Sequence, residues 1–131
     1  MNLILPTKVE IKYIEGKGYG VFATEVITPG EIIEECHLVS IPQKDIDNKE
    51  ILPDYRFSYP KHKTKEFVIP FGFGCIYNHS HLNNADWRDH PTLKLLQFYA
   101  IKHIFPKQEI CTYYGNVEYW EGLKYKNIKL I

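Results

Sequence analysis

A dense run of polar side chains follows an aromatic stretch in the middle of the chain, in the segment CIYNHSHLNNADW at residues 75–87. Amide and imidazole groups at this density are costly to bury unless each one finds a hydrogen-bond partner. The run is therefore either a surface loop with a chemical task or a buried polar crossing of the fold. Metal binding, glycosylation and nucleophilic catalysis have to be weighed for it.

The surrounding sequence supports none of these three chemistries. His79, His81 and His90 lack the carboxylate or cysteine that would complete a familiar metal-ligand spacing. The tripeptide at 78–80 fits the glycosylation sequon, but MNLILPTKVE does not have the long apolar run of a signal peptide, so we expect this match to be accidental. A cysteine nucleophile needs its thiolate beside a base, and nothing in the pattern gives Cys75 such a neighbour.

The composition is that of an ordinary globular protein. Its 131 residues are enough for one domain with a core and too few for two. Lysine plus arginine equal aspartate plus glutamate at 16 each, so no basic field argues for direct nucleic-acid binding. Three widely spaced cysteines favour a reducing compartment over a disulfide framework. Because no apolar stretch reaches the length of a membrane span, we expect an intracellular protein without a membrane partner.

The elements that must position the polar run read as short strands. KVEIKYIE alternates apolar and polar residues, which predicts a half-buried strand, and the glycines of GKGYG separate it from a second strand, VFATEVI. TPGE at 28–31 predicts a turn, and EIIEECHLVSIP predicts a third strand. LKLLQFYAIKHIF and ICTYYG also read as strands. The charged, proline-bearing residues 43–67 read as loops, with one short helical turn at 45–51.

Four motifs, taken together and in order, resemble the SET domain of protein lysine methyltransferases. They are GYGVFA at 18–23, NHSHLNNA at 78–85, YAIKHI at 99–104 and EICTYYG at 109–115. Each motif is weak alone, and their order and separations carry the resemblance, which spans about residues 9–120. Two positions depart from the family pattern: Asn83 stands where a proline is usual, and Lys107 stands where the last turn usually has glycine.

The resemblance implies a mainly β fold, a β-clip of several small sheets with a C-terminal pseudoknot. In that arrangement the last strand threads the asparagine–histidine segment, so the polar run would be structural and cofactor-binding at once. Residues 1–131 would form a single SET domain, with a core at about 9–120 and a C-terminal lid at about 116–131.

The resemblance also implies S-adenosyl-L-methionine as the cofactor, without a metal. The expected cofactor-binding residues are Lys17, Gly18, Tyr19, Asn78, His79, Tyr114 and Trp120. The expected catalytic residues are Tyr114 and Tyr55, and the expected substrate-channel residues are Tyr55, Thr112 and Tyr113. Tyr114 would orient the reacting groups without acting as a full base, since a tyrosine hydroxyl ordinarily has a pKa near 10. Tyr55 and Trp120 could equally serve the core alone.

The partner implied is a histone H3 tail or another lysine-bearing protein tail. A cluster of acidic residues could line a groove for a basic peptide or form a solvated face; its members are Glu31, Glu34, Glu35, Asp45 and Asp47. The chain is most like compact viral members of the family, with small bacterial members as the second choice. A histone-directed enzyme would act in the nucleus of a eukaryotic or host cell, and otherwise in the cytoplasm. A homodimer is compatible with the aromatic-rich sequence.

Three other functions stay open at this point. The chain could be a catalytically inactive SET-like module that binds peptide, a methyltransferase of a non-histone protein, or an unrelated β-rich interaction domain with accidental motifs. The presence of Tyr114 together with Asn78 and His79 favours an enzyme. The target lysine and the number of methyl groups are not predicted, because Thr112 stands where a phenylalanine or tyrosine often tunes that number.

Overall fold

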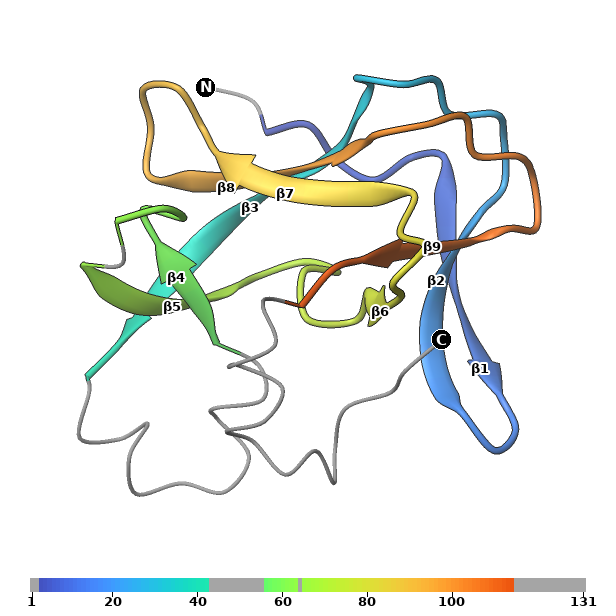
Figure 1. Cartoon of the computed structure of the whole chain (residues 1–131), viewed down its shortest axis with the longest axis horizontal. Coiled ribbons are helices and arrows are strands. Elements are labelled where there is room, and N and C mark those ends of the chain that lie inside the picture. The colour runs from blue at the N-terminus through green and yellow to red at the C-terminus, as the bar shows by residue number, and fades with distance from the viewer. Residues whose placement is uncertain (1–2, 43–55, 64, 115–131) are drawn as a thin grey trace.

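The computed structural model describes residues 3–42, 56–63 and 65–114, and these residues form strands and turns without a helix. The strands are β1 (Val9–Ile14), β2 (Gly18–Ala23), β3 (Ile32–Ile41), β4 (Phe57–Tyr59), β5 (Glu66–Pro70), β6 (Asn78–His79), β7 (Ala85–Asp89), β8 (Leu95–Ala100) and β9 (Glu109–Thr112). They make a 4-stranded sheet in the order β1-β2-β9-β6 and a 5-stranded sheet in the order β4-β5-β3-β8-β7 (Figure 1). The predicted mainly β class is confirmed.

The first sheet begins with a hairpin that carries the glycine-rich motif. β1 and β2 pair antiparallel from Val9↔Ala23 to Ile14↔Gly18, and Gly16 takes a φ of +81° in the turn between them. The glycines were expected to lie before the second strand, but that strand begins at Gly18 and so includes two of them. A strand can contain glycine where another chain segment approaches closely, and β9 lies against β2 here.

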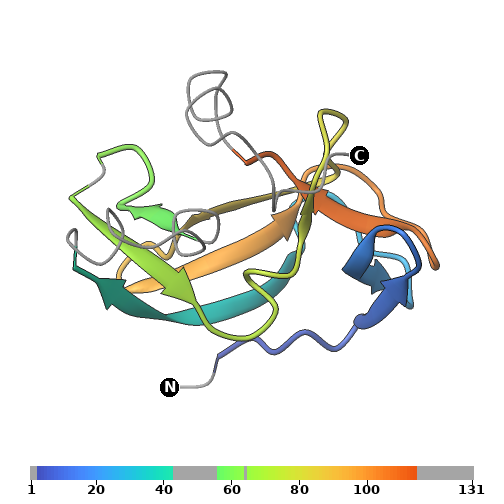
Figure 2. The same ribbon diagram turned by 90° about the horizontal axis from the view of Figure 1, so that it is seen from below.

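The second sheet is organised around β3, its longest strand. β3 pairs antiparallel with β5 on one side and with β8 on the other. The predicted turn at 28–31 leads into β3: the Glu31 amide donates to the Thr28 carbonyl at 3.0 Å, and Gly30 has a φ of +86°. Figure 2 shows the long strands of this sheet beside the β1–β2 hairpin.

Three further details of the strand prediction were wrong. β4 lies in a segment that was expected to be loop, because its three residues are too few to show a period. β7 was missed because its sequence ADWRD is polar, as suits a strand at the edge of a sheet. The expected strand at 93–105 ends at Ala100, where the chain bends before the bridge between Ile104 and Ile27.

The buried core contains residues from both sheets and from the start of the polar run. Its members are Val21, Ala23, Ile27, Ile33, Cys36, Tyr77, Ala85, Leu96, Phe98, Ala100, Ile104 and Ile110. Among them, the ring of Tyr77 stacks on that of Phe98 with 4.7 Å between centroids. Tyr77 immediately precedes β6, so the core fixes the start of the asparagine–histidine segment.

β9 lies between the glycine-rich strand and the asparagine–histidine strand. It pairs antiparallel with β2 and parallel with β6, where Asn78 is opposite Cys111 and His79 is opposite Thr112. At the other end of the polar run, the backbone N–H of Asn84 donates to the Cys111 carbonyl at 3.2 Å. Both ends of the segment 78–84 are thus bonded to β9, which is the adjacency that the SET resemblance implies.

Candidate active site

Asn78 connects the three segments of the candidate site, at 17–20, 77–84 and 109–114. It is 2% exposed, and its side-chain amide donates to the Tyr19 carbonyl at 3.1 Å and to Glu109 Oε2 at 2.6 Å. One buried amide therefore holds β2 and β9 together. Each bond satisfies a donor that would be costly to leave unpaired inside the protein.

Glycine at position 20 makes this contact possible. A Cβ atom there would lie 2.5 Å from Glu109 Oε2 and 3.0 Å from Asn78 Nδ2, closer than such atoms approach. The other carboxylate oxygen of Glu109 accepts from the Lys17 ammonium at 2.5 Å, and both side chains are partly buried. Glu109 thus links the turn after β1 with Asn78, a role that sequence analysis missed although the residue opens the closing motif.

His79 lies at the centre of the site and is fully buried. Its Nδ1 atom accepts a hydrogen bond from the Tyr114 backbone amide at 2.9 Å, which requires that nitrogen to be unprotonated. Burial, and then the neighbouring His81 ring, lower the pKa of His79 to about 4. The imidazole is therefore neutral near pH 7 and acts as a fixed acceptor for the backbone of the last strand.

Tyr114 is held at two points. Besides its backbone bond to His79, its hydroxyl donates to the Tyr77 carbonyl oxygen at 2.5 Å. Because the hydroxyl proton is used in that bond, the Tyr114 oxygen can act toward other groups only as a hydrogen-bond acceptor. The residue as a whole is half-buried, and its hydroxyl lies beside the start of β6.

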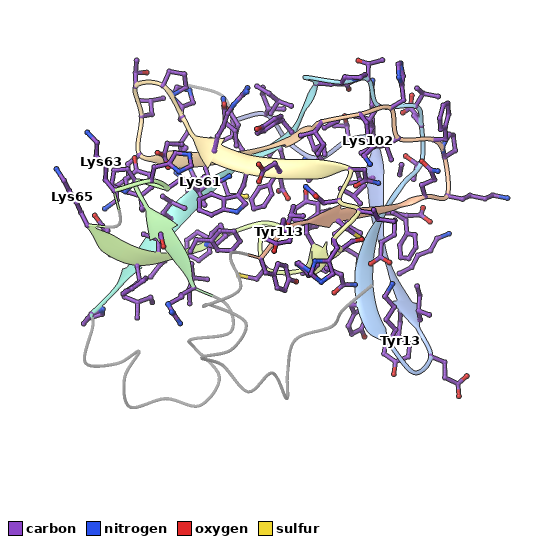
Figure 3. The ribbon with its side chains drawn as sticks, in the orientation of Figure 1. Tyr13, Lys61, Lys63, Lys65, Lys102 and Tyr113 are labelled. Atoms are coloured by element: carbon purple, nitrogen blue, oxygen red, sulfur yellow. The ribbon has the colours of Figure 1, made fainter. Side chains whose placement is uncertain are left out.

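Tyr113 and Thr112 complete the end of β9. The Tyr113 ring packs against His79 at 4.9 Å and against His81 at 5.7 Å, near the middle of the molecule in Figure 3. Thr112 is 2% exposed, so its side chain is enclosed by the fold. The half-buried Tyr113 is the more accessible of the two.

Most of the predicted site residues come together in the described part of the chain. The residues that lie on the three adjoining segments are Lys17, Gly18, Tyr19, Asn78, His79, Thr112, Tyr113 and Tyr114. Gly18 has a φ of +97°, which favours glycine. Tyr55, Trp120 and the expected lid at 116–131 lie outside the described residues.

The acidic cluster was left open as either a peptide groove or a solvated face, and the glutamates that the structure describes do not gather into a groove. Glu31 pairs with Lys8 at 2.8 Å, and Glu35 accepts from the Gln97 amide at 2.8 Å. Glu34 is 1% exposed and accepts from the Tyr77 hydroxyl at 2.6 Å, so it is neither groove nor solvated face. The three side chains serve separate contacts within the fold, and the remaining two members of the cluster lie outside the described residues.

Two further residues of the site were not identified as functional from sequence. Asn84 bonds to the backbone of β9 through its side chain, donating to the Glu109 carbonyl at 2.8 Å and accepting from the Cys111 amide at 2.9 Å. Tyr77 supplies the carbonyl that receives the Tyr114 hydroxyl. Asn84 could have been identified from sequence, because it is a polar residue within the motif at 78–85. Nothing in the sequence distinguished Tyr77 from an ordinary aromatic residue of the core.

Other chemistries find little support in the described residues. Burial raises the pKa of Cys75 to about 11 and that of Cys111 to about 12, so both thiols are protonated at neutral pH and are poor nucleophiles. In residues 3–42, 56–63 and 65–114, no three or more histidine, cysteine, aspartate or glutamate side chains gather as a metal site. Nor does this part of the chain contain a helix long and apolar enough to cross a membrane.

Comparison with known proteins finds matches over most of the chain. The family model "SET domain" matches residues 18–115. A Schizosaccharomyces pombe protein, histone-lysine N-methyltransferase, H3 lysine-37 specific, is 24% identical over 121 residues, covering 90% of this chain and 80% of its own length. The crystal structure of a Plasmodium falciparum protein thought to be a histone methyltransferase superposes with a TM-score of 0.70 at 33% identity, covering 83% of this chain and 94% of that one.

Proposed function

The chain belongs to the SET-domain family, and on that premise we propose that it is an S-adenosyl-L-methionine-dependent protein lysine N-methyltransferase that acts on a histone H3 tail. The observation that carries the proposal is the double anchoring of Tyr114 beside the Asn78–His79 strand. Members of this family generally use S-adenosylmethionine. The name of the fission-yeast relative supports histone H3 as the substrate class.

The acceptor lysine presents the main chemical difficulty. The pKa of a lysine ε-amine in water is about 10.4, and the amine must lose a proton before it can attack a methyl group, a deficit of roughly 4–5 kcal/mol near pH 7. An acceptor such as the Tyr114 oxygen can orient the neutral amine through one of its N–H bonds. Correct alignment of reacting groups can contribute roughly 7–11 kcal/mol in favourable systems.

The oxygen atoms around Tyr114 suit the cofactor chemically. When bound, S-adenosylmethionine would supply a methyl group on a positively charged sulfur. The Tyr77 carbonyl and the Tyr114 hydroxyl are electron-rich and adjacent, and neutral His79 adds no opposing charge. These groups therefore fit a cation better than an anion.

The cofactor-binding roles follow from the same three segments. Lys17, Gly18 and Tyr19 would contact the methionine end, since a backbone with a glycine permits close approach. Asn78 and His79 would contribute mainly through backbone atoms, because their side chains already bond to other parts of the site. Tyr113 would line the lysine channel beside Tyr114. Tyr55 keeps the catalytic and substrate-channel role proposed for it from sequence, and Trp120 keeps its proposed cofactor-binding role.

The proposed function is tested by incubating the protein with labelled S-adenosylmethionine and separate core histones. The wild type is expected to label histone H3, and Tyr114→Phe is expected to lower the rate about 100-fold, as for loss of one well-placed polar group in an active site. Tyr13→Phe is the matched control, because it removes a hydroxyl from an exposed tyrosine on the outer hairpin (Figure 3).

Three outcomes would contradict parts of the proposal. Equal labelling by wild type and Tyr114→Phe would remove the role of Tyr114. Labelling of a non-histone protein alone would change the substrate class. Cofactor binding without any transfer would favour a peptide-binding module.

A histone substrate would put the enzyme in a nucleus. The likeness to compact viral members stays a prediction, since the relatives reported above come from a yeast and from Plasmodium.

A further inference from the structure

A buried carboxyl lies on the opposite side of Tyr77 from the candidate site. Glu34 is 1% exposed, and none of the ion pairs among the described residues includes it. Its Oε1 atom accepts from the Tyr77 hydroxyl at 2.6 Å, and its Oε2 atom accepts from the Phe73 amide at 3.3 Å. Burial raises the pKa of Glu34, which is the expected effect of removing a carboxyl from water.

The turn before β6 is shaped to admit this carboxyl. Gly72 has a φ of +75°, and a Cβ atom at that position would lie 2.7 Å from Glu34 Oε2. A side chain at 72 would therefore displace the carboxyl as well as strain the backbone. Tyr77 itself is 1% exposed and is clamped from a second direction by the stacked ring of Phe98.

Filling the core does not explain the pair. A phenylalanine and an aliphatic residue would occupy similar volume without burying a carboxyl, and replacements of buried charges by apolar groups are often neutral or stabilising. A buried polar pair specifies one arrangement of the groups that it joins. What it fixes here is the orientation of the Tyr77 peptide, because the side chain of Tyr77 is bonded at its far end.

The same residue carries the carbonyl to which Tyr114 donates its hydroxyl. We propose that Glu34 is a positioning residue that acts through Tyr77: it anchors the Tyr77 side chain on β3 so that the Tyr77 carbonyl aims the Tyr114 hydroxyl into the site. This inference rests on the proposed function for its catalytic consequence, whereas the positioning itself is a property of the protein alone.

The positioning is measured first without any turnover. Tyr77–Asn78 is the one Tyr–Asn dipeptide in the sequence, so protein labelled with ¹³C-carbonyl tyrosine and ¹⁵N-asparagine gives a single correlated NMR signal that reports the Tyr77 carbonyl. Loss of an accepted hydrogen bond moves a carbonyl carbon upfield. Tyr114→Phe is expected to move this signal upfield, and Glu34→Leu, which removes the acceptor for the Tyr77 hydroxyl, is expected to move it in the same direction.

Val68→Ala is the matched control for that measurement. Val68 is fully buried in β5 and has no part in the candidate site, so its truncation loosens the core without touching the Glu34–Tyr77 bond. The signal should stay in place in this variant. A signal that moves in Tyr114→Phe but not in Glu34→Leu would overturn the inference, as would one that moves in neither.

Kinetics provide the second measurement. Glu34→Leu and Tyr77→Phe are expected to lower kcat roughly 10- to 100-fold, with KM for both substrates unchanged within about twofold, because misorientation acts on the reacting geometry. In a Tyr114→Phe background the same two changes should have no further effect on kcat. Val68→Ala should retain wild-type kcat at a temperature where all variants are folded.

Independent, multiplying losses in the double variants would overturn the inference, because the anchor would then act on something other than Tyr114. Unchanged kcat in both single variants would also overturn it. A wild-type protein that transfers no methyl group would instead refute the proposed function, and the NMR signal would still decide whether Glu34 positions the Tyr77 carbonyl.

Discussion

At the scale of single residues, His79 combines complete burial with a bond that only its neutral form can make. An unfolded histidine has a pKa of about 6.5, whereas that of His79 is lowered to about 4. Between these values the unfolded state binds more protons than the folded state, so the free energy of unfolding falls as the pH falls through that window. His79 should account for a loss of about 2–3 kcal/mol between pH 7 and pH 4.

The His79 contribution is measured by urea unfolding of the wild type and of His79→Asn at several pH values between 4 and 7. The variant should be less stable at pH 7 and should lose less stability on acidification. Comparing the two proteins cancels Glu34, whose raised pKa acts with the opposite sign. His103→Asn, a change at an exposed histidine, should keep the wild-type pH dependence; identical curves for His79→Asn and wild type would refute the expectation.

Lys107 presents a second residue-scale test. The Gln108 amide donates to the Phe105 carbonyl at 3.0 Å, which closes a turn with Pro106 second and Lys107 third. Lys107 has a φ of +76°, a region that costs a residue with a side chain about 1–2 kcal/mol. Lys107→Gly removes this strain but adds freedom to the unfolded chain, so a net stabilisation of about 0.5–1 kcal/mol is expected.

The control for Lys107→Gly is Lys102→Gly. Lys102 is an exposed lysine nearby in the chain whose φ is not positive (Figure 3). At Lys102, glycine adds freedom to the unfolded chain without relieving any backbone strain. The free energy of unfolding, measured with denaturant, is therefore expected to fall by about 0.5–1 kcal/mol. Equal effects from the two changes would show that the turn carries no strain.

At the scale of elements, the Asn84 side chain adds to the strand pairing of β9 by bonding to its backbone. Its side chain satisfies both the Glu109 carbonyl and the Cys111 amide. Asn84→Ala leaves two backbone groups unpaired inside the protein. The free energy of unfolding, measured by heat or denaturant, should therefore fall by about 2–4 kcal/mol. Asn83→Ala is the control: it removes one bond, to the Ala85 carbonyl, and should cost about 1 kcal/mol. Comparable losses would mean that Asn84 does not fasten β9.

The strands differ in how far the sequence alone predicts them. β1, β3 and β8 were predicted because their apolar residues recur with a strand period or form a continuous run. β4 and β7 escaped because one is very short and the other is a polar edge, so their pairing with β5 and β8 decides their conformation. The local sequence pattern predicts a strand where apolar residues alternate with polar ones or form a continuous run. It fails where pairing with a neighbouring strand decides the conformation.

The candidate site divides in the same way. Asn78, His79 and Tyr114 belong to motifs, and the resemblance brought them together before any coordinates. The partners that hold them could not be predicted, since Tyr77, Glu34 and their bond join residues 43 positions apart whose types are ordinary in a core. A hydrogen bond between distant residues leaves no periodic trace in the sequence.

At the scale of the whole molecule, the proposed cofactor site joins three segments that are remote in sequence. A ligand bound only by the folded protein stabilises it by about 2.7 kcal/mol at a hundred times its dissociation constant. For a domain of this size that corresponds to a rise in Tm of roughly 10 °C. S-adenosylmethionine at that concentration should produce such a rise in differential scanning fluorimetry, and adenosine at the same concentration should produce a much smaller one.

The Tyr13–Tyr19 pair makes that measurement specific to the site. Both rings are exposed, at 63% and 57%, and they contact each other edge to face at 5.1 Å, so either alanine substitution removes the same ring contact. Only Tyr19 adjoins Asn78, through its carbonyl. Tyr19→Ala should therefore lose about a third of the cofactor-induced rise, with a ligand-free Tm like that of Tyr13→Ala, because a stacking or edge contact contributes about 1 kcal/mol. Tyr13→Ala should keep the full rise. If both variants respond to the cofactor as the wild type does, the hairpin end at Tyr19 is not part of the binding site, and the ligand must be held by the other two segments alone.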